Sequence, residues 1–138
     1  MAKPPVVAEL VWTDALRFNV TSARVSTVID GDSTAGPSPV QMLVFGLAGC
    51  MAADVVDLVR KGRHSLTGLT ARIVAERAQE PPTRVVRAEL QFQLRGDVPA
   101  AAVERAIALS RDRYCSVWHS LRQDIELSTS FDITPGSA

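Results

Sequence analysis

The chain has 138 residues, of which 46% are hydrophobic, and this length and composition fit one globular domain with a core of its own. Fifteen basic residues balance fifteen acidic ones and are scattered along the sequence, so we expect neither nucleic acid nor a membrane as a partner. Two cysteines do not make a disulfide framework, and the first residues lack the apolar run of a signal peptide, so we expect a cytoplasmic protein.

Three short strands are predicted at the start of the chain, within residues 6–30. The segments VVAELVW and LRFNVT alternate between the two faces of a strand, and RVSTVID is rich in β-branched residues. Period-two patterning with short turns predicts an antiparallel meander. The stretch GDSTAGPSP that follows has the composition of a loop.

A long helix is predicted over residues 39–61. Ser38 suits the N-cap, Pro39 the first helical position and Gln41 the third, which together form a capping box. Gly62 suits the C-terminal cap.

The first half of this helix is apolar on every side. Residues 40–53 carry no charge, and a helix that is apolar all round is expected to be buried all round. The strongly apolar stretch 42–53 is too short to span a bilayer. Gly46 and Gly49 are expected to let another backbone approach closely beside Cys50.

Two long strands, a helix and a last strand are predicted within residues 66–133. The turn QEPPT separates the two long strands, and the second of these alternates between an apolar and a polar face. The helix begins near Asp97 and Pro99, and its 3.6-residue apolar stripe consists of Val103, Ala106, Ile107, Ser110 and Tyr114. A short further helix is expected in SVWHSLRQ, before the last strand DIELSTSFDI.

The predicted element order is β-β-β-α-β-β-α-β. It indicates a single α+β domain over residues 1–138, with two main helices packed on a mostly antiparallel sheet.

The two cysteines, Cys50 in the apolar helix and Cys115 just past the second helix, are either inert small hydrophobes or one reactive pair. A thiol becomes a nucleophile only as the thiolate, which needs a nearby cation or hydrogen-bond donor. Asp54, four residues after Cys50, opposes the thiolate, so an arginine from elsewhere in the fold would have to offset it.

No metal site and no cofactor are expected. The two cysteines and the two histidines, His64 and His119, lack the close Cys-x-x-Cys and His-x-x-x-His spacings of zinc sites. His119 is expected to be a partly buried structural residue, and a role as an acid or base near Cys115 is the other interpretation. The glycines of GLAG lie inside a helical pattern and do not form a phosphate-binding loop.

The segments PSPVQMLVFGLAGCMAADVV and AIALSRDRYCSV, in this element order, resemble the OsmC/Ohr family, the osmotically inducible and organic hydroperoxide resistance proteins. The resemblance extends over residues 7–133 and is strongest to the YhfA-like subgroup, through DVVDLVRKGR, AERAQEPP and RYCSV. It implies an OsmC-like fold and an intertwined homodimer, in which each N-terminal meander packs across the partner and the long helices are buried at the centre.

The resemblance also implies a cysteine-based peroxidase of the oxidative stress response. Cys50 matches the peroxidatic cysteine, whose thiolate would attack the O–O bond of an organic hydroperoxide and become a sulfenic acid. Cys115 matches the resolving cysteine, which would form a disulfide that an external dithiol, such as a lipoyl protein, reduces. The alternative is a non-catalytic OsmC-like dimer that binds a small apolar ligand or acts as a redox sensor.

The sequence departs from the family pattern at Val40. Well-characterised branches have a glutamate at this place, which orients an arginine against the thiolate. Arg17, in the N-terminal hairpin, is the nearest positional candidate for that arginine, and Arg24 is a second. Without the glutamate, the protein would be a slower peroxidase, would use another clamp, or would have the alternative function.

Overall fold

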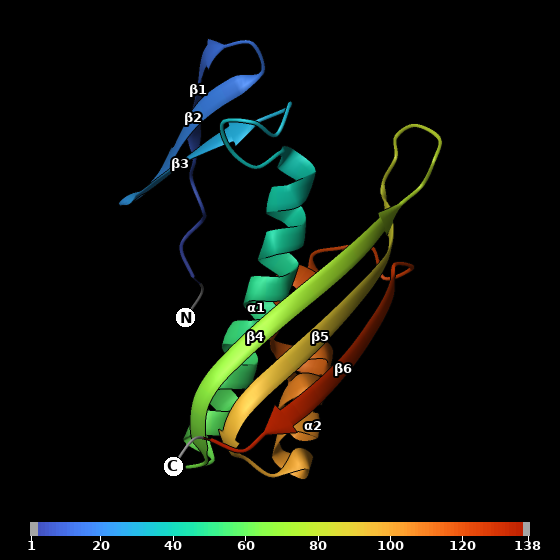
Figure 1. Cartoon of the computed structure of the whole chain (residues 1–138). Helices are drawn as coiled ribbons and strands as arrows, with labels where there is room; N and C mark the ends of the chain where they lie inside the picture. Colours follow the sequence, from blue (N-terminus) through green and yellow to red (C-terminus); the bar gives the residue numbers. More distant parts are fainter. Residues whose placement is uncertain (1–2, 137–138) are drawn as a thin grey trace. The chain divides into compact units, whose positions relative to one another are not determined.

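The computed structural model describes residues 3–136, which form two compact units with a boundary between Leu43 and Val44. The elements, shown in Figure 1, are β1 (Glu9–Asp14), β2 (Arg17–Ser22), β3 (Val25–Asp30), α1 (Pro39–Lys61), β4 (Ser65–Arg77), β5 (Val85–Asp97), α2 (Ala100–Leu109), the π-helical turn η1 (Ser110–Tyr114), α3 (Ser116–His119) and β6 (Glu126–Thr134). The predicted α+β class and the predicted order of the main elements are confirmed. The organisation as one domain stays a prediction.

The N-terminal unit contains the predicted antiparallel meander. Phe18 of β2 pairs with Trp12 of β1 on one side and with Ile29 of β3 on the other. β1 is exposed along its whole length. The exposed large hydrophobic side chains of this unit include Val6, Val7, Leu10, Val11, Trp12, Leu16 and Val25. One chain therefore leaves much of the apolar surface of this small sheet in contact with water.

Helix α1 begins at the predicted capping box. The backbone N–H of Gln41 donates to the Ser38 hydroxyl at 3.2 Å, and the Gln41 side-chain oxygen accepts from the Ser38 N–H at 2.9 Å. These two bonds satisfy backbone donors that the first turn of a helix leaves unpaired, so the helix begins where the sequence predicts.

The prediction that the first half of α1, residues 40–53, is buried on all sides is wrong for the single chain. Only one residue per turn is buried, at Leu47, Met51, Val55 and Val59. Phe45 is 54% exposed, and a Cβ at Gly49 would meet nothing within 4 Å outside its own stretch of helix. The expected close approach of a backbone at Gly46 is also missing, since its nearest neighbour there is the Val117 side chain at 4.0 Å. One sheet and one further helix cover only one side of α1.

By length and composition alone, α1 could cross a membrane. Its most apolar 18-residue window has a mean hydropathy of 1.9 and is 22% buried. A core helix of a soluble protein meets the same criterion. The buried stripe of α1 belongs to the hydrophobic core of the C-terminal unit, which favours the core-helix interpretation.

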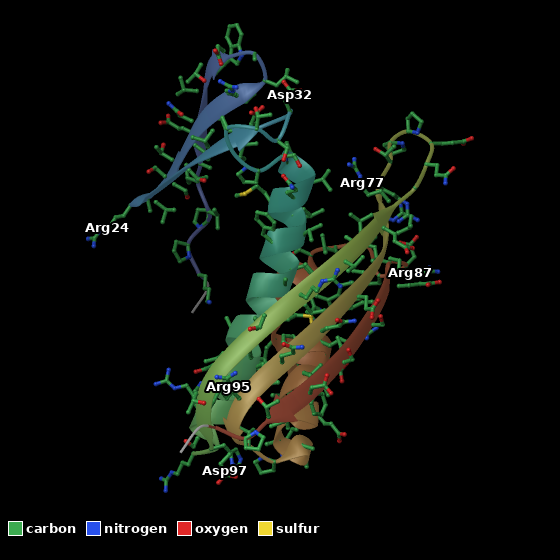
Figure 2. The ribbon with its side chains drawn as sticks, viewed as in Figure 1. Arg24, Asp32, Arg77, Arg87, Arg95 and Asp97 are labelled. Carbon is green, nitrogen blue, oxygen red and sulfur yellow. The ribbon has the colours of Figure 1, made fainter. Side chains whose placement is uncertain are left out.

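The C-terminal unit is a three-stranded sheet in the order β4–β5–β6, with helices on one face (Figure 1). The predicted alternation of β5 is confirmed: Ala88, Leu90, Phe92 and Leu94 are buried. The intervening Arg87 and Arg95 project from the other face, as Figure 2 shows. β4 and β5 are antiparallel, whereas β5 and β6 are parallel, because the chain crosses back through α2, η1 and α3 before β6 begins.

The predicted apolar stripe of the second helix is wrong at its last member. Val103, Ala106, Ile107 and Ser110 are buried, but Tyr114 is 51% exposed. The reason is the π-helical turn η1, which closes with the bond from the Cys115 N–H to the Ser110 carbonyl at 2.8 Å. One extra residue in this turn moves the buried position one residue along the chain, so that Cys115 takes the place predicted for Tyr114.

Candidate redox site

The structure brings Cys50 and Cys115 together within the C-terminal unit. Cys50 lies on α1 and is half-buried, whereas Cys115 lies between η1 and α3 and is 0% exposed. Both are free thiols, and Cys50 is near enough to Cys115 to raise the pKa of the Cys115 thiol. The fold thus places two distant parts of the sequence in contact through their sulfur atoms.

The surroundings of Cys115 keep it protonated. Burial, with a smaller contribution from the neighbouring Cys50 thiol, raises the pKa of the Cys115 thiol to about 11. The backbone N–H of Trp118, which donates to the Cys115 Sγ at 3.3 Å, acts in the opposite direction without overcoming burial. Cys115 is therefore a neutral thiol near pH 7 and a poor nucleophile for a first attack.

A carboxylate and a hydroxyl lie beside the thiols. The Ser110 Oγ donates to the Asp54 Oδ2 at 2.8 Å, and Ser110 is fully buried. From the sequence, Asp54 is expected on a water-facing stripe with Asp57 and Lys61 and as a charge that opposes the thiolate, and Ser110 is expected as a member of the apolar stripe. Asp54 is instead half-buried, because it packs against Ser110. A weak signal for the pairing is Ser110 itself, a polar residue in a stripe that is otherwise apolar.

His119 is exposed, and its Nε2 hydrogen-bonds to the Arg111 carbonyl at 2.9 Å. This bond to the backbone favours the structural interpretation, although the ring is less buried than expected. The Arg111 guanidinium donates to the Leu127 carbonyl of β6 at 2.8 Å and lies over the Trp118 ring, 5.8 Å from its centroid. These contacts fix η1 and α3 against the sheet.

Arg17 lies in the N-terminal unit, where its guanidinium has two carboxylate partners. Its Nε is 3.4 Å from the Asp30 Oδ2, and its Nη1 is 3.8 Å from the Asp14 Oδ1. Arg24, the second candidate, is exposed in the turn between β2 and β3 and points away from the sheet (Figure 2).

Asp30 is a buried carboxylate that the sequence pattern does not predict. The backbone N–H groups of Ala35 and Asp32 donate to it, each at 2.9 Å, and Thr34 donates through both its backbone and its hydroxyl. These donors hold the pKa of Asp30 well below its usual range despite burial. Asp30 is therefore ionised at neutral pH and gives Arg17 a fixed partner, although Val40 cannot provide one.

Metal ligands are not grouped within the described residues 3–136: no cluster of three or more His, Cys, Asp or Glu side chains in this part of the chain could hold a metal ion. The thiol pair is the candidate reactive centre of the C-terminal unit.

The comparisons with known proteins identify the family of the chain. The family model described as "OsmC-like protein" matches residues 30–130, a range that contains both cysteines and begins after Arg17. Protein YhfA of Escherichia coli (strain K12) is 33% identical over 129 residues, which cover 91% of this chain and 96% of that protein. The chain belongs to the OsmC-like family.

Solved structures share the OsmC-like fold. A hypothetical protein from Aquifex aeolicus VF5 has a TM-score of 0.90 at 20% identity, over 98% of this chain and 100% of that chain. An organic hydroperoxide resistance protein OsmC from Legionella pneumophila has a TM-score of 0.71 at 14% identity, over 96% and 99% of the two chains. At these identities the likeness extends to the OsmC-like fold and not to the details of the site.

Proposed function

We propose that the protein is a thiol-dependent peroxidase that reduces organic hydroperoxides to alcohols. The contact between two free thiols in unequal surroundings carries the proposal: Cys50 is half-buried, and Cys115 is fully buried and protonated. The name of the Legionella relative, an organic hydroperoxide resistance protein, supports the choice of substrate.

In the first step, the Cys50 thiolate attacks one oxygen of the hydroperoxide ROOH. The S–O bond forms as the O–O bond breaks, and the leaving alkoxide takes up a proton and departs as the alcohol ROH. The sulfur is oxidised by two electrons to a sulfenic acid, and the hydroperoxide is reduced by the same two electrons. Cys115, as a neutral thiol, escapes direct oxidation in this step.

In the second step, the Cys115 sulfur attacks the sulfenic sulfur of Cys50. The S–S bond forms, the S–O bond breaks, and the hydroxyl leaves as water with the proton of the Cys115 thiol. An external dithiol, for which a lipoyl group is suited, then reduces the disulfide by two exchange reactions. A cytoplasmic location would provide such a reductant and would keep both thiols reduced between turnovers.

Arg17 is proposed as the cation that favours the Cys50 thiolate. The assignment follows the family resemblance, and one observation supports it: the ionised Asp30 holds the Arg17 Nε. Asp30 would thus replace the family glutamate as the partner that orients the arginine.

The proposed enzyme is a homodimer. An uncovered apolar face of α1 and an exposed apolar sheet in the N-terminal unit are surfaces that a soluble protein seldom leaves in water. A second copy of the chain would cover both.

The dimer is tested by a charge placed on α1. The wild-type protein is expected to sediment as a dimer at low micromolar concentration, and Phe45→Glu is expected to sediment as a monomer, because the partner would bury the new carboxylate. Val74→Glu, at a position 39% exposed on β4, is the matched control and should remain dimeric. A well-folded wild-type monomer at this concentration would contradict the dimer.

The peroxidase is tested by its choice of oxidant. In stopped-flow experiments, the reduced protein should react with cumene and linoleic hydroperoxides at least about tenfold faster than with hydrogen peroxide, and faster than a free thiol such as N-acetylcysteine. Rates equal to those of the free thiol would leave the non-catalytic dimer as the better interpretation.

A further inference from the structure

The π-helical turn η1 places Cys115, and Ser110 holds this turn at two points. The Ser110 carbonyl accepts the bond from the Cys115 N–H at 2.8 Å that closes the turn. The Ser110 hydroxyl donates to the Asp54 carboxylate of α1, also at 2.8 Å. A single buried residue therefore connects the backbone of Cys115 to α1.

Asp54 follows Cys50 by one turn of α1, so both side chains lie on the same side of that helix. The thiol pair and the carboxylate–hydroxyl pair are consequently neighbouring contacts between α1 and the segment 110–115. On its other side, Arg111 bonds the turn to Leu127 of β6. That bond fixes the turn to the sheet, and the Asp54–Ser110 bond connects the turn to α1.

We infer that Asp54 is a positioning residue, whose hydrogen bond to Ser110 holds Cys115 against Cys50 and so promotes formation of their disulfide. The effective concentration of one thiol toward another depends on how narrowly the fold restricts their separation. Without the bond, the turn samples positions in which the two sulfur atoms are further apart, and disulfide formation becomes less favourable. The physiological use of this disulfide rests on the proposed function, but the thiol–disulfide equilibrium does not.

The test measures that equilibrium without any peroxide. The reduced protein is equilibrated with mixtures of oxidised and reduced glutathione. In this equilibrium the Cys50 and Cys115 thiols react with one glutathione disulfide, which gives the Cys50–Cys115 disulfide and two glutathione thiols. Ser110→Ala and Asp54→Ala should each lower the equilibrium constant for disulfide formation by about tenfold, a rise of about 30 mV in the reduction potential. The equilibrium constant of Asp54→Asn should stay within twofold of the wild-type value, because its amide oxygen still accepts the hydrogen bond from the Ser110 hydroxyl.

The comparison of Asp54→Ala with Asp54→Asn separates the hydrogen bond from the charge, since both variants remove the carboxylate charge. The equilibrium constant of the double variant Asp54→Ala/Ser110→Ala should be no lower than that of either single variant, as expected for two groups that share one contact. Asp57→Ala removes an exposed carboxylate from the same helix, and Ser120→Ala removes a hydroxyl that bonds to the Ser116 carbonyl. Both controls should match wild type, and thermal unfolding shows that each variant is folded.

The inference would be overturned if Ser110→Ala and Asp54→Ala kept the wild-type equilibrium constant. It would also be overturned if the equilibrium constant of Asp54→Asn were as low as that of Asp54→Ala. The result is independent of the peroxidase proposal. If Cys50 fails to react with hydroperoxides while the glutathione equilibrium shifts as described, the proposed function fails and the positioning role of Asp54 stands.

Discussion

A Cys50→Ser variant is expected to lose hydroperoxide consumption completely, whereas Cys115→Ser is expected to complete one turnover and then stop. In the Cys50→Ser variant, Cys115 is the remaining cysteine, and it cannot take over the first attack. It is fully buried, and its thiol stays protonated at neutral pH. In the second, Cys50 still reduces one hydroperoxide, but its sulfenic acid has no partner with which to form a disulfide.

Consumption of cumene hydroperoxide over several equivalents, together with intact-protein mass spectrometry, distinguishes the two variants. Cys115→Ser should gain the mass of one oxygen atom and react with dimedone, and wild type should instead lose two hydrogen atoms as its disulfide forms. The two variants are controls for each other, since each replaces one sulfur by oxygen. Continued turnover by Cys50→Ser would contradict the proposed mechanism.

Arg17→Met is expected to slow the reaction of Cys50 with hydroperoxide by at least about tenfold at pH 7. An opposite charge within about 4–6 Å of an ionisable group changes its ionisation equilibrium by this factor or more, so removal of the guanidinium should lower the fraction of Cys50 thiolate. Alkylation of Cys50 by iodoacetamide should slow by a similar factor, because it uses the same thiolate.

Arg24→Met is the matched control for this experiment. It makes the same substitution in the same N-terminal unit, at an exposed side chain in the turn between β2 and β3 that points away from the sheet (Figure 2). Both rates should stay at the wild-type level in this variant. Equal slowing in the two variants would show that net charge, rather than the contact of one arginine, controls the reaction.

Local patterns in the sequence predict much of this fold because their physical causes are local. The Ser38–Gln41 capping box specifies the start of α1, and alternation along β5 specifies its buried face. Tyr114 shows where this reasoning ends: a 3.6-residue period assumes uniform winding, and the π-helical turn makes Cys115 the buried residue instead.

Two other features depend on information that a linear pattern does not contain. The bonds to Asp30 come largely from backbone N–H groups of a loop, whose geometry leaves no residue signature. The apolar sides of α1 predict burial but not what provides it, so a single chain with Phe45 in water is compatible with the same sequence. For the site, the placement of the two cysteines left an inert and a reactive interpretation open, and the family resemblance favoured a reactive pair. The Asp54–Ser110 bond required the structure.

The parallel pairing of β5 with β6 sets the order in which a growing chain can assemble. β4 and β5 are joined by a short turn and can pair while synthesis continues, but β6 pairs with β5 only after the whole crossover has been made, as Arg87 opposite Glu126 illustrates. Cys115 lies within that crossover. Cys50 therefore leaves the ribosome before Cys115, and an oxidant that reaches it during this time meets a single thiol that has no partner with which to form a disulfide.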